Sequence, residues 1–370
     1  MKILALEPYL GGSHQAFLDG WTARSRHTWT VLGLPAHKWK WRMRHAAITL
    51  AGMAGEETRR TGRPDLVLCS DMLNLAEFLG LARGLIGRLP VVAFFHENQL
   101  TYPVRHEDQR DLHFAFTNLT TALAADRVWF NSAFHRGSFL EAIVELLARM
   151  PDYQPAEAPR QIRHKSSIQP PGIEPMPPRG PRAPGPLRIL WAARWEFDKN
   201  PEEFFEALRI LKSSGVDFRL SVIGQRFRDC PAVFDWAREH FREHLDRWGY
   251  QEDCREYRAA LAEADLVVST ALHEFFGIGV VEAIAAGARP LLPRRLTYPE
   301  ILQPLGPAAG DFLYEGGAEV LARRMEELAG RMARGDFWRA DPSRLIRAVA
   351  RFHWDARAEA MDRALEEITA

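Results

Sequence analysis

The sequence predicts an α/β protein built from two doubly wound domains that face each other across a cleft. Short apolar segments alternate with longer segments of helical periodicity, which is the pattern of parallel strands joined by crossover helices. A proline-rich segment at residues 170–186 interrupts this alternation near the middle of the chain. The length of 370 residues also suggests about two domains.

The expected strands are short apolar runs, five before the proline-rich segment and four after it. They lie at residues 3–6, 29–33, 66–70, 91–95, 128–131, 187–192, 218–223, 266–270 and 289–292. The prolines of residues 170–186 exclude a helix or a central strand there, so we expect a semi-rigid linker. The expected domains are residues 1–169 and 187–351, followed by a C-terminal helix at 352–370 that crosses back to the first domain.

The composition is that of an ordinary globular chain, with 46% hydrophobic and 26% charged residues. No apolar run approaches the roughly 20 residues of a membrane helix, and the chain start reads as a first strand rather than a signal peptide. The three cysteines have no paired spacing, so neither a zinc site nor a disulfide framework is expected. We therefore expect a cytoplasmic protein without a membrane partner.

The formal net charge is zero, but the two halves differ. Residues 1–169 hold 20 Lys and Arg against 16 Asp and Glu, whereas residues 187–370 hold 26 against 31. A polyanionic partner is therefore expected to meet the first half.

The most informative motif is HEFFGIGVVEA at residues 273–283, which follows an expected strand and leads into an expected helix. A strand, a short Gly-containing turn and a helix start place backbone N–H groups where a phosphate or a sugar hydroxyl can dock. Eight residues span about 2.2 helical turns, so we expect Glu274 and Glu282 on one helix face. One carboxylate would accept hydrogen bonds from a sugar and the other from a ribose diol. The spacing alone equally allows a solvated Glu and a Glu that interacts with the helix dipole.

In doubly wound sheets, ligands bind at the carboxyl ends of the strands. Gly11 and Gly12 follow the first expected strand and precede a helix that we expect Ser13 to cap. A Gly-Gly turn lets a diphosphate approach the backbone, but it serves any tight turn equally well. His96 follows the fourth expected strand and opens a run of four polar residues, so it is either a donor to a sugar or a structural histidine.

Two cations follow the first expected strand of the second half. Arg194 and Lys199 precede a helix that we expect to begin near Pro201. At this position we expect their cationic side chains to bind two phosphates of a nucleotide. The alternative is a pair of surface salt bridges with Glu196 or Asp198. Together with the Gly-Gly turn and the two glutamates, these cations favour a nucleotide diphosphate site.

Residues 37–45, HKWKWRMRH, interleave cations with aromatic side chains and contain no acid. Such a segment suits an unstacked base with its flanking phosphates, as in an anticodon loop. The alternative is a solvated helix start whose tryptophans pack inward. The candidate contacts are Lys38, Trp39, Lys40, Trp41, Arg42 and Arg44. Residues 102–110 are a candidate for an adjoining wall of the cleft.

Arg194 and Lys199, with the segment from Glu274 to Glu282, resemble glycosyltransferase family 4, a retaining group with the GT-B fold. The resemblance covers nearly the whole chain. Three blocks narrow it to the tRNA-queuosine alpha-mannosyltransferases: EPYLGGSH at 7–14, LPAHKWKWR at 34–42 and FHENQLTYP at 95–103. This resemblance implies transfer of mannose from GDP-mannose to the cyclopentenediol of queuosine in a tRNA anticodon. It also implies a first domain that binds tRNA, a second domain that binds the nucleotide sugar, and no metal or other cofactor.

The resemblance implies a role for each candidate residue. Glu274 would bind sugar hydroxyls and Glu282 the ribose diol, while Arg194 and Lys199 would neutralise the diphosphate leaving group. His96 would hold the sugar near the scissile bond. The remaining donor contacts would come from Gly11, Gly12, Phe275, Phe276 and Gly277. A phosphate oxygen would take the acceptor proton, unlike in the two-carboxylate glycosidases, so we expect neither a protein nucleophile nor a general base.

Two other functions stay open on the sequence. One is a family-4 glycosyltransferase with another nucleotide sugar and a lipid or saccharide acceptor. The lack of an evident amphipathic membrane-facing helix near the acceptor region counts against it. The other is a tRNA-binding protein that has lost transfer. The presence of Arg194, Lys199, Glu274 and Glu282 together counts against that alternative.

Overall fold

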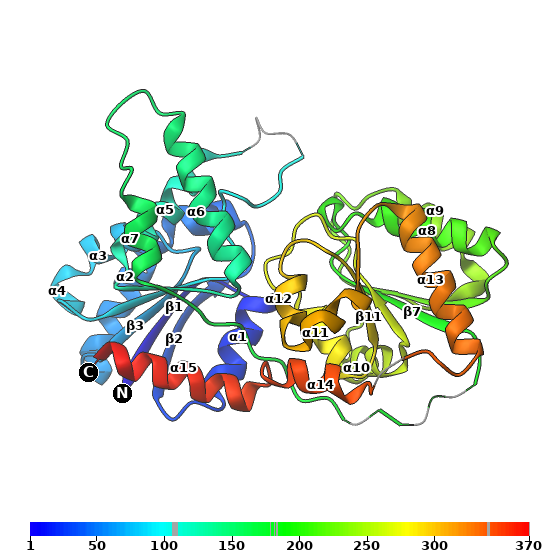
Figure 1. The fold of residues 1–370 in the computed structure, drawn as a ribbon. Coiled ribbons are helices and arrows are strands. Elements are labelled where there is room, and N and C mark those ends of the chain that lie inside the picture. The colour runs from blue at the N-terminus through cyan, green and yellow to red at the C-terminus, as the bar shows by residue number, and fades with distance from the viewer. Residues whose placement is uncertain (106–109, 178, 181, 183, 339–340, 370) are drawn as a thin grey trace. The chain divides into compact units, whose positions relative to one another are not determined.

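The computed structural model describes residues 1–105, 110–177, 179, 180, 182, 184–338 and 341–369. The chain forms two compact units, residues 1–172 with 354–370, and residues 173–353. Each unit contains a six-stranded parallel sheet with helices on both faces (Figure 1). The predicted class, α/β with two doubly wound units, is confirmed. Residues 106–109 of the expected cleft wall and residues 178, 181 and 183 of the expected linker lie outside the described residues.

The sheet of the first unit has the strand order β2-β1-β3-β4-β5-β6. Its strands are β1 (Lys2–Leu10), β2 (Thr28–Pro35), β3 (Leu66–Ser70), β4 (Val91–Phe95), β5 (Arg127–Phe130) and β6 (Ser166–Ile168). Its helices are α1 (Gly12–Thr22), α2 (Trp39–Thr61), α3 (Leu75–Leu81), α4 (Arg83–Ile86), α5 (Leu112–Ala124), α6 (Ala133–Ala148), α7 (Ala158–His164) and α15 (Trp354–Thr369).

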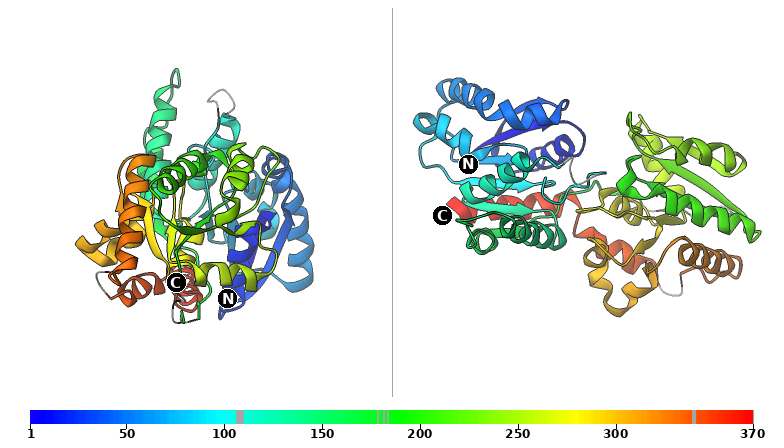
Figure 2. Two further views of the ribbon diagram at one scale, coloured as in Figure 1. Left: turned by 90° about the vertical axis from the view of Figure 1, so that its right-hand side faces the viewer. Right: turned by 90° about the horizontal axis from the view of Figure 1, so that it is seen from above.

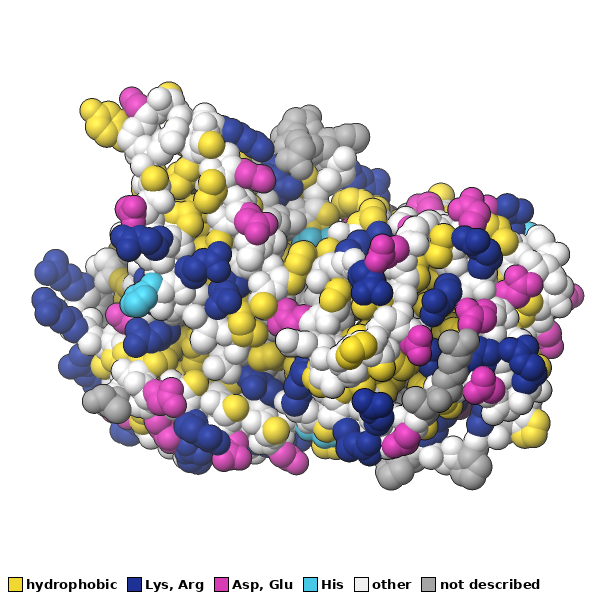
Figure 3. Space-filling view, viewed as in Figure 1, with side chains coloured by type: hydrophobic (Ala, Val, Ile, Leu, Met, Phe, Trp, Pro, Cys, Tyr) yellow, Lys and Arg dark blue, Asp and Glu magenta, His cyan; other side chains and the backbone are white. Residues whose placement is uncertain are grey.

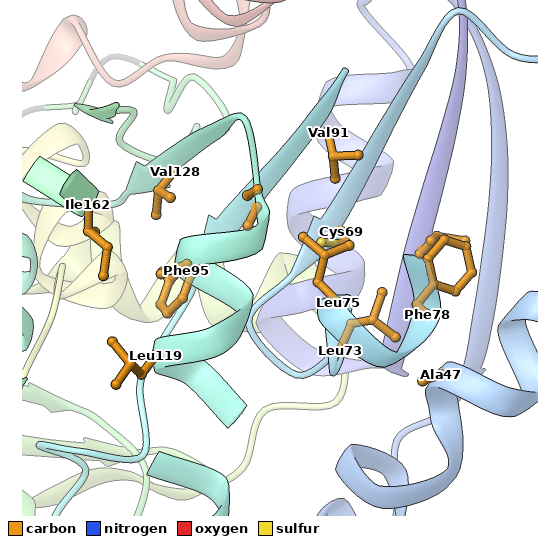
Figure 4. Packing of buried hydrophobic residues seen from close by; sticks show 14 of the residues in the cluster. Ala47, Cys69, Leu73, Leu75, Phe78, Val91, Phe95, Leu119, Val128 and Ile162 are labelled. Atoms are coloured by element: carbon orange, nitrogen blue, oxygen red, sulfur yellow. The ribbon is translucent and has the colours of Figure 1, made fainter. Parts of the chain in front are cut away.

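Alternating side chains of the first sheet supply two cores, because successive strand residues point to opposite faces. Leu4 and Leu6 of β1 join the core formed with α2, α3, α5, α6 and α7, part of which Figure 4 shows. Ile3 and Ala5 join the core formed with α1 and α15. Both faces of the sheet are therefore buried, as is usual for parallel sheets.

The last helix of the chain belongs to the first unit. α15 contacts α1, and the two helices can be followed in blue and red in Figure 2. A Cβ atom on Gly20 of α1 would lie 2.2 Å from the Trp354 ring, so the side-chain-free position lets the two helices approach closely.

The sheet of the second unit has the strand order β12-β11-β10-β7-β8-β9. Its strands are β7 (Leu187–Ala192), β8 (Phe218–Ile223), β9 (Leu245–Gly249), β10 (Leu266–Val268), β11 (Arg289–Pro293) and β12 (Leu313–Tyr314). The α-helices on one face include α8 (Pro201–Ser213), α9 (Val233–His240) and α13 (Ala318–Ala333). Those on the other include α10 (Cys254–Glu263), α11 (Ile278–Ala285), α12 (Tyr298–Leu302) and α14 (Ser343–Ala350). Short 3₁₀ helices are η2 (Phe197–Lys199), η3 (Arg242–His244) and η4 (Gln303–Phe312).

Nine predicted strands are present, and three more were not predicted. The additional strands are β6, β9 and β12, which all lie at sheet edges. β6 and β9 are only partly buried, and β12 has two residues. Edge strands of this kind need no continuous apolar run, so the hydrophobic pattern does not reveal them.

The described residues of the proline-rich segment form no helix or strand apart from one isolated bridge between Ile173 and His353. Arg179 and Arg182 each place a guanidinium nitrogen 2.8 Å from a carboxylate oxygen of Asp265, which is buried at the start of β10. The segment is therefore attached to the second unit along part of its length.

Charge is distributed unevenly over the surface. Figure 3 shows Lys and Arg side chains gathered at the edge of the first unit near α4, whereas basic and acidic side chains alternate over the visible face of the second unit. Among the helices of the described residues, none combines the length and the apolar character that a membrane span requires.

Candidate active site

The predicted donor residues of the second unit meet at the point where its strand order reverses. β7 pairs with β8 on one side and with β10 on the other, so the ends of β7 and β10 form the switch point at which doubly wound sheets bind their ligands. The segment after β7 carries Arg194 and Lys199, and the segment after β10 carries Glu274. The Thr270 hydroxyl donates a hydrogen bond of 2.9 Å to the Lys199 carbonyl, which ties the two segments together.

Lys199 is buried and holds the two segments through its ammonium group. Its Nζ atom lies 2.7 Å from the His273 carbonyl oxygen, 3.0 Å from Asp198 Oδ2 and 3.4 Å from Glu274 Oε2. Burial alone would lower the pKa of Lys199, but Glu274 and Asp198 outweigh it and raise the pKa above its usual value. The His273 carbonyl and the Glu274 carboxylate accept hydrogen bonds from the ammonium, and Asp198 forms an ion pair with it. Lys199 is therefore a charged group that orients Glu274.

Glu274 is ionised by its neighbours. Burial alone would raise its pKa, but the charges of Lys199, His273 and Arg194 outweigh burial and lower it. The guanidinium of Arg194 is half-exposed and pairs with Glu196 at 3.1 Å. Of the alternatives considered from the sequence, the surface salt bridge of Arg194 with Glu196 occurs, whereas Lys199 pairs with Asp198 in a buried position. The exposed pair of Arg194 contributes little stability, so this guanidinium can exchange a carboxylate for a phosphate.

Gly277 ends the irregular segment and begins α11. Its φ of 79° lies in the left-handed region, and a Cβ atom there would come within 3.3 Å of the Tyr298 ring and 3.4 Å of Glu274 Cγ. Glu274 lies before this break and Glu282 after it, so the prediction that both occupy one helix face is wrong. A positive φ at Gly277 interrupts the helix that the eight-residue spacing assumed. The side chains of Phe275 and Phe276 are buried.

Glu282 lies in α11 and has a partner that the sequence did not reveal. The Tyr257 hydroxyl of α10 donates a hydrogen bond of 2.6 Å to Glu282 Oε2. Burial raises the pKa of Glu282, and this hydrogen bond opposes the shift. Tyr257 orients the carboxylate, which still has its second oxygen as an acceptor.

In the first unit, His96 lies directly after β4 in a polar network. Its backbone N–H donates to Asp71 Oδ1 at 2.8 Å, and its carbonyl accepts from the Asn131 side chain at 2.9 Å. The Ser132 hydroxyl oxygen caps α6 by accepting a hydrogen bond from the His135 backbone N–H. The network holds the His96 backbone from the ends of β3 and β5.

A buried ion pair lies beside His96 and was not predicted. Glu7 of β1 is 2% exposed and His14 of α1 is 7% exposed, with His14 Nδ1 3.1 Å from Glu7 Oε2. The other oxygen of Glu7 accepts hydrogen bonds of 2.9 Å from the Ser70 hydroxyl and the Tyr9 backbone N–H. The rings of His14 and His96 lie 4.0 Å apart between centroids.

Glu7, His14 and His96 are also the group of described residues whose ligand atoms come within 4.8 Å of one another. Burial alone would lower the pKa of His14, but Glu7, Asp71 and Glu97 outweigh it and raise the pKa to about 9. A protonated imidazole has no lone pair for a metal. We therefore interpret Glu7 and His14 as an ion pair.

The Gly-Gly turn contains two different glycines. A Cβ atom on Gly11 would lie 2.4 Å from the Ala36 Cβ atom, so Gly11 permits close packing against the segment after β2. Gly12 has a φ of 54° and open space where a Cβ would stand. The prediction that Ser13 caps α1 is wrong, because the helix begins at Gly12 with Gly11 as its N-cap and has no side-chain cap.

The aromatic and basic segment of residues 37–45 forms the start of α2. Trp41 is 60% exposed and its ring stacks on His45 with centroids 4.7 Å apart. Trp39 packs on Phe114 of α5, and the Arg44 guanidinium lies over the same ring. The predicted contacts Lys38, Trp39, Lys40, Trp41 and Arg44 therefore surround one surface at the beginning of α2.

Arg42 differs from the other cations of this segment because it is buried, with 8% exposure. Its guanidinium lies 2.9 Å from the Pro35 carbonyl oxygen and 2.9 Å from His45 Nε2. His37 lies at 3.1 Å. The expectation that Arg42 contacts a phosphate is therefore wrong for this structure. Through its contact with the Pro35 carbonyl, the buried Arg42 attaches the start of α2 to the end of β2.

Comparisons with known proteins agree with this geometry. The family model described as glycosyl transferases group 1 matches residues 174–329. The fold resembles a sucrose-phosphate synthase from Thermosynechococcus elongatus, with a TM-score of 0.72 and 14% identity over 100% of this chain and 99% of that one. It also resembles a glycosyltransferase from Rickettsia africae, with a TM-score of 0.68 and 13% identity over 99% and 98%. Fold and matched domain define a glycosyltransferase of the GT-B class.

Comparisons that include the first half of the chain identify a family within this class. The model described as tRNA-queuosine alpha-mannosyltransferase N-terminal matches residues 2–173. A tRNA-queuosine alpha-mannosyltransferase from Drosophila melanogaster is 35% identical over 311 residues, which cover 81% of either chain. A GDP-mannose:cellobiosyl-diphosphopolyprenol alpha-mannosyltransferase from Xanthomonas campestris is 25% identical over 58% of this chain and 52% of its own. The chain belongs to the tRNA-queuosine alpha-mannosyltransferase family, as the three sequence blocks indicated.

Proposed function

We propose that this glycosyltransferase transfers mannose from GDP-mannose to the cyclopentenediol of queuosine in a tRNA anticodon, with retention of configuration. The observation that carries the proposal is the Lys199–Glu274 pair at the switch point of the second sheet, in a chain of this family. An ionised Glu274 beside a charged Lys199 and a half-exposed Arg194 offers a sugar-hydroxyl acceptor next to cations for a diphosphate.

Donor binding follows from the chemistry of these groups. Glu274 accepts hydrogen bonds from mannose hydroxyls, and Glu282, oriented by Tyr257, accepts from the ribose diol. Arg194 and Lys199 stabilise the charge that develops on the departing diphosphate. These two cations supply the charge that a metal ion would otherwise supply, so we propose transfer without a metal. Gly277 and the neighbouring backbone N–H groups are the proposed backbone contacts of the second unit.

Acceptor binding is proposed at the start of α2. The exposed ring of Trp41 offers a platform on which an unpaired base stacks, and Lys38, Lys40 and Arg44 offer charge to the flanking phosphates. Base stacking on an aromatic side chain contributes about 1–3 kcal/mol per base. For a tRNA substrate we also propose a cytoplasmic enzyme without a membrane partner.

The test of the activity uses the purified protein, GDP-mannose and queuosine-containing tRNA. Nucleosides from the digested tRNA are analysed by mass spectrometry, with tRNA lacking queuosine as the control substrate. A hexose added to queuosine supports the proposal. Donor hydrolysis without a nucleoside product would instead favour a transferase with another acceptor, and tRNA binding without donor use would favour a binding protein that has lost transfer.

The test of the acceptor surface compares two matched sets of variants. Lys38, Lys40 and Arg44 are changed to Ser in one protein, and the exposed Arg209, Arg238 and Arg242 of the second unit are changed to Ser in the other. The first set should weaken tRNA binding and flatten its dependence on salt, because fewer counterions are released. Equal salt slopes for the two proteins would remove this surface from the proposal. Trp41→Ala should lower affinity for queuosine tRNA by roughly tenfold.

A further inference from the structure

Three titratable side chains from two elements and a strand end come together in the first unit. Glu7 lies near the carboxyl end of β1, His14 lies in the first turn of α1, and His96 directly follows β4. The carboxylate of Glu7 meets His14 Nδ1 at 3.1 Å, and the His14 ring lies against the His96 ring with centroids 4.0 Å apart at 30°. Two imidazoles in such close contact cannot both be cationic at low energy, because like charges repel strongly when buried.

The charged and titratable neighbours of the two rings come from every surrounding element. Asp71 follows β3, Glu97 is next in the chain to His96, and His135 lies in α6. Burial, His14 and His135 lower the pKa of His96 well below its usual value, whereas Glu7, Asp71 and Glu97 overcome burial to raise that of His14 to about 9. Asp71 itself is buried, and burial together with Glu97 raises its pKa.

We propose that Glu7 and His14 are positioning residues that hold His96 as a neutral imidazole, so that His96 accepts a hydrogen bond from a substrate hydroxyl. Glu7 selects which of the two rings carries the proton, and the imidazolium of His14 then keeps a second proton off His96. A neutral imidazole has one acceptor nitrogen, whereas an imidazolium has none. The hydroxyl belongs either to the sugar being transferred or to the acceptor diol. This inference rests on the proposed function and adds to it two residues that the sequence motif contains but does not explain.

The first test is the pH dependence of kcat/KM for transfer, measured between pH 5 and pH 8. The wild type should keep its activity toward acid pH. His14→Gln should move the acid limb upward by about half a pH unit or more, which is roughly a threefold additional loss on that limb. Glu7→Gln should move it in the same direction, and the double variant should move it no further, since Glu7 acts through His14. His164→Gln, at an exposed histidine of α7, is the control and should leave the profile unchanged.

The same variants also show whether the hydroxyl that His96 contacts belongs to the sugar or to the acceptor diol. Slow hydrolysis of GDP-mannose without tRNA should show the same shifted acid limb if His96 contacts the sugar. If His96 contacts the acceptor diol, only transfer to tRNA should show the shift. Either result supports the proposal. An unchanged acid limb in the folded His14→Gln protein for both reactions would overturn it.

The second test needs no activity and therefore separates failure of this inference from failure of the proposed function. Histidine side chains labelled with ¹⁵N are followed by NMR in the ligand-free protein, with signals assigned from the His14→Gln and His96→Gln variants. We expect His14 to be protonated at pH 8 and His96 to be neutral at pH 6. An ordinary titration of His96 near pH 6.5, or a neutral His14 at pH 7, would refute the charge arrangement whatever the enzyme transfers.

Discussion

At the scale of single residues, Glu274 combines a structural contact with a proposed catalytic one. Its carboxylate is the partner of Lys199 at 3.4 Å and is also the proposed acceptor for mannose hydroxyls. Glu274→Gln keeps the shape of the side chain and removes its charge. We expect turnover to fall by about two orders of magnitude, since charged hydrogen-bond partners at a reacting centre contribute on that scale. Single-turnover transfer measures this fall, and tRNA binding should stay within about twofold. Equal losses of transfer and tRNA affinity would contradict the assignment.

We expect Tyr257 to affect nucleotide binding through its hydrogen bond to Glu282. Tyr257→Phe removes one hydroxyl and leaves the ring in place, so the Glu282 carboxylate loses its 2.6 Å partner. A hydrogen bond to a charged group contributes about 1.5–3 kcal/mol, so GDP should bind at least roughly tenfold more weakly. Titration calorimetry with GDP checks the value. Tyr250→Phe, at a 65% exposed tyrosine of the same unit, should leave it unchanged. If both variants bind GDP like the wild type, Tyr257 does not orient a nucleotide-binding carboxylate.

The ion pair of Glu7 and His14 predicts a pH-dependent stability. The folded-state pKa of His14 is about 9, above the ordinary value of 6.5, so the folded protein holds this proton more tightly than the unfolded chain does. The resulting stabilisation, roughly 3 kcal/mol at most, is fully present below pH 6.5 and is lost as the pH rises through about 9.

Glu7→Gln keeps the acceptor oxygen for Ser70 and Tyr9 but removes the charge that holds the proton on His14. Thermal unfolding at pH 6 should show a clear loss of stability in the variant. At pH 9.5, the difference in stability between the variant and the wild type should shrink toward zero. A difference that is the same at both pH values would show that the pair does not exchange a proton in this range.

At the scale of elements, the turn before α11 depends on Gly277. The positive φ of this residue and the 3.3 Å approach to Tyr298 leave little room for a side chain. Gly277→Ala should destabilise the second unit by about 1–3 kcal/mol and displace Glu274, so transfer should fall more than stability alone explains. Gly137→Ala in α6 is the control, because its Cβ would meet nothing within 4 Å and helix propensity favours Ala. Denaturant unfolding and transfer assays on both proteins test the contrast.

The elements also show how far sequence reasoning reaches. Central strands such as β4 and β7 were predicted because they are buried on both faces and read as continuous apolar runs. The carboxyl ends of parallel strands lie at one edge of their sheet, so the residues that follow β4 and β7 were predicted as site residues. These residues are His96, Arg194 and Lys199. The edge strands β6, β9 and β12 lacked this signal, because β6 and β9 are only partly buried and β12 has two residues.

Other features needed three-dimensional contacts. Tyr257 reaches Glu282 from a different helix, and no spacing in the chain connects the two. Arg42 was expected on the surface because its neighbours are basic, yet it lies on the buried face of α2 with Met43 and Ala46. His14 lies in the block EPYLGGSH that indicated the family, but only its contact with Glu7 explains why its pKa is raised.

At the scale of the whole molecule, the chain leaves the first unit at residue 172 and returns to it at residue 354. The first unit is therefore completed only after the second unit has been synthesised. Trp354 is the residue at which the chain re-enters the first unit. It is 4% exposed and packs against Gly20 and Gly172, which both lack the Cβ atoms that would collide with its ring.

Trp354→Ala should therefore destabilise the first unit by about 3–5 kcal/mol, as large-to-small changes of buried aromatic residues do. Because the chain has two units, hydrogen exchange with mass spectrometry measures the effect better than one unfolding midpoint. Peptides from β1, α1 and α15 should lose protection, while those from β7 and β8 should keep it. Trp236→Ala, at a 44% exposed tryptophan of α9, should change neither set. Uniform loss of protection in both units after Trp354→Ala would mean that the two units unfold as one.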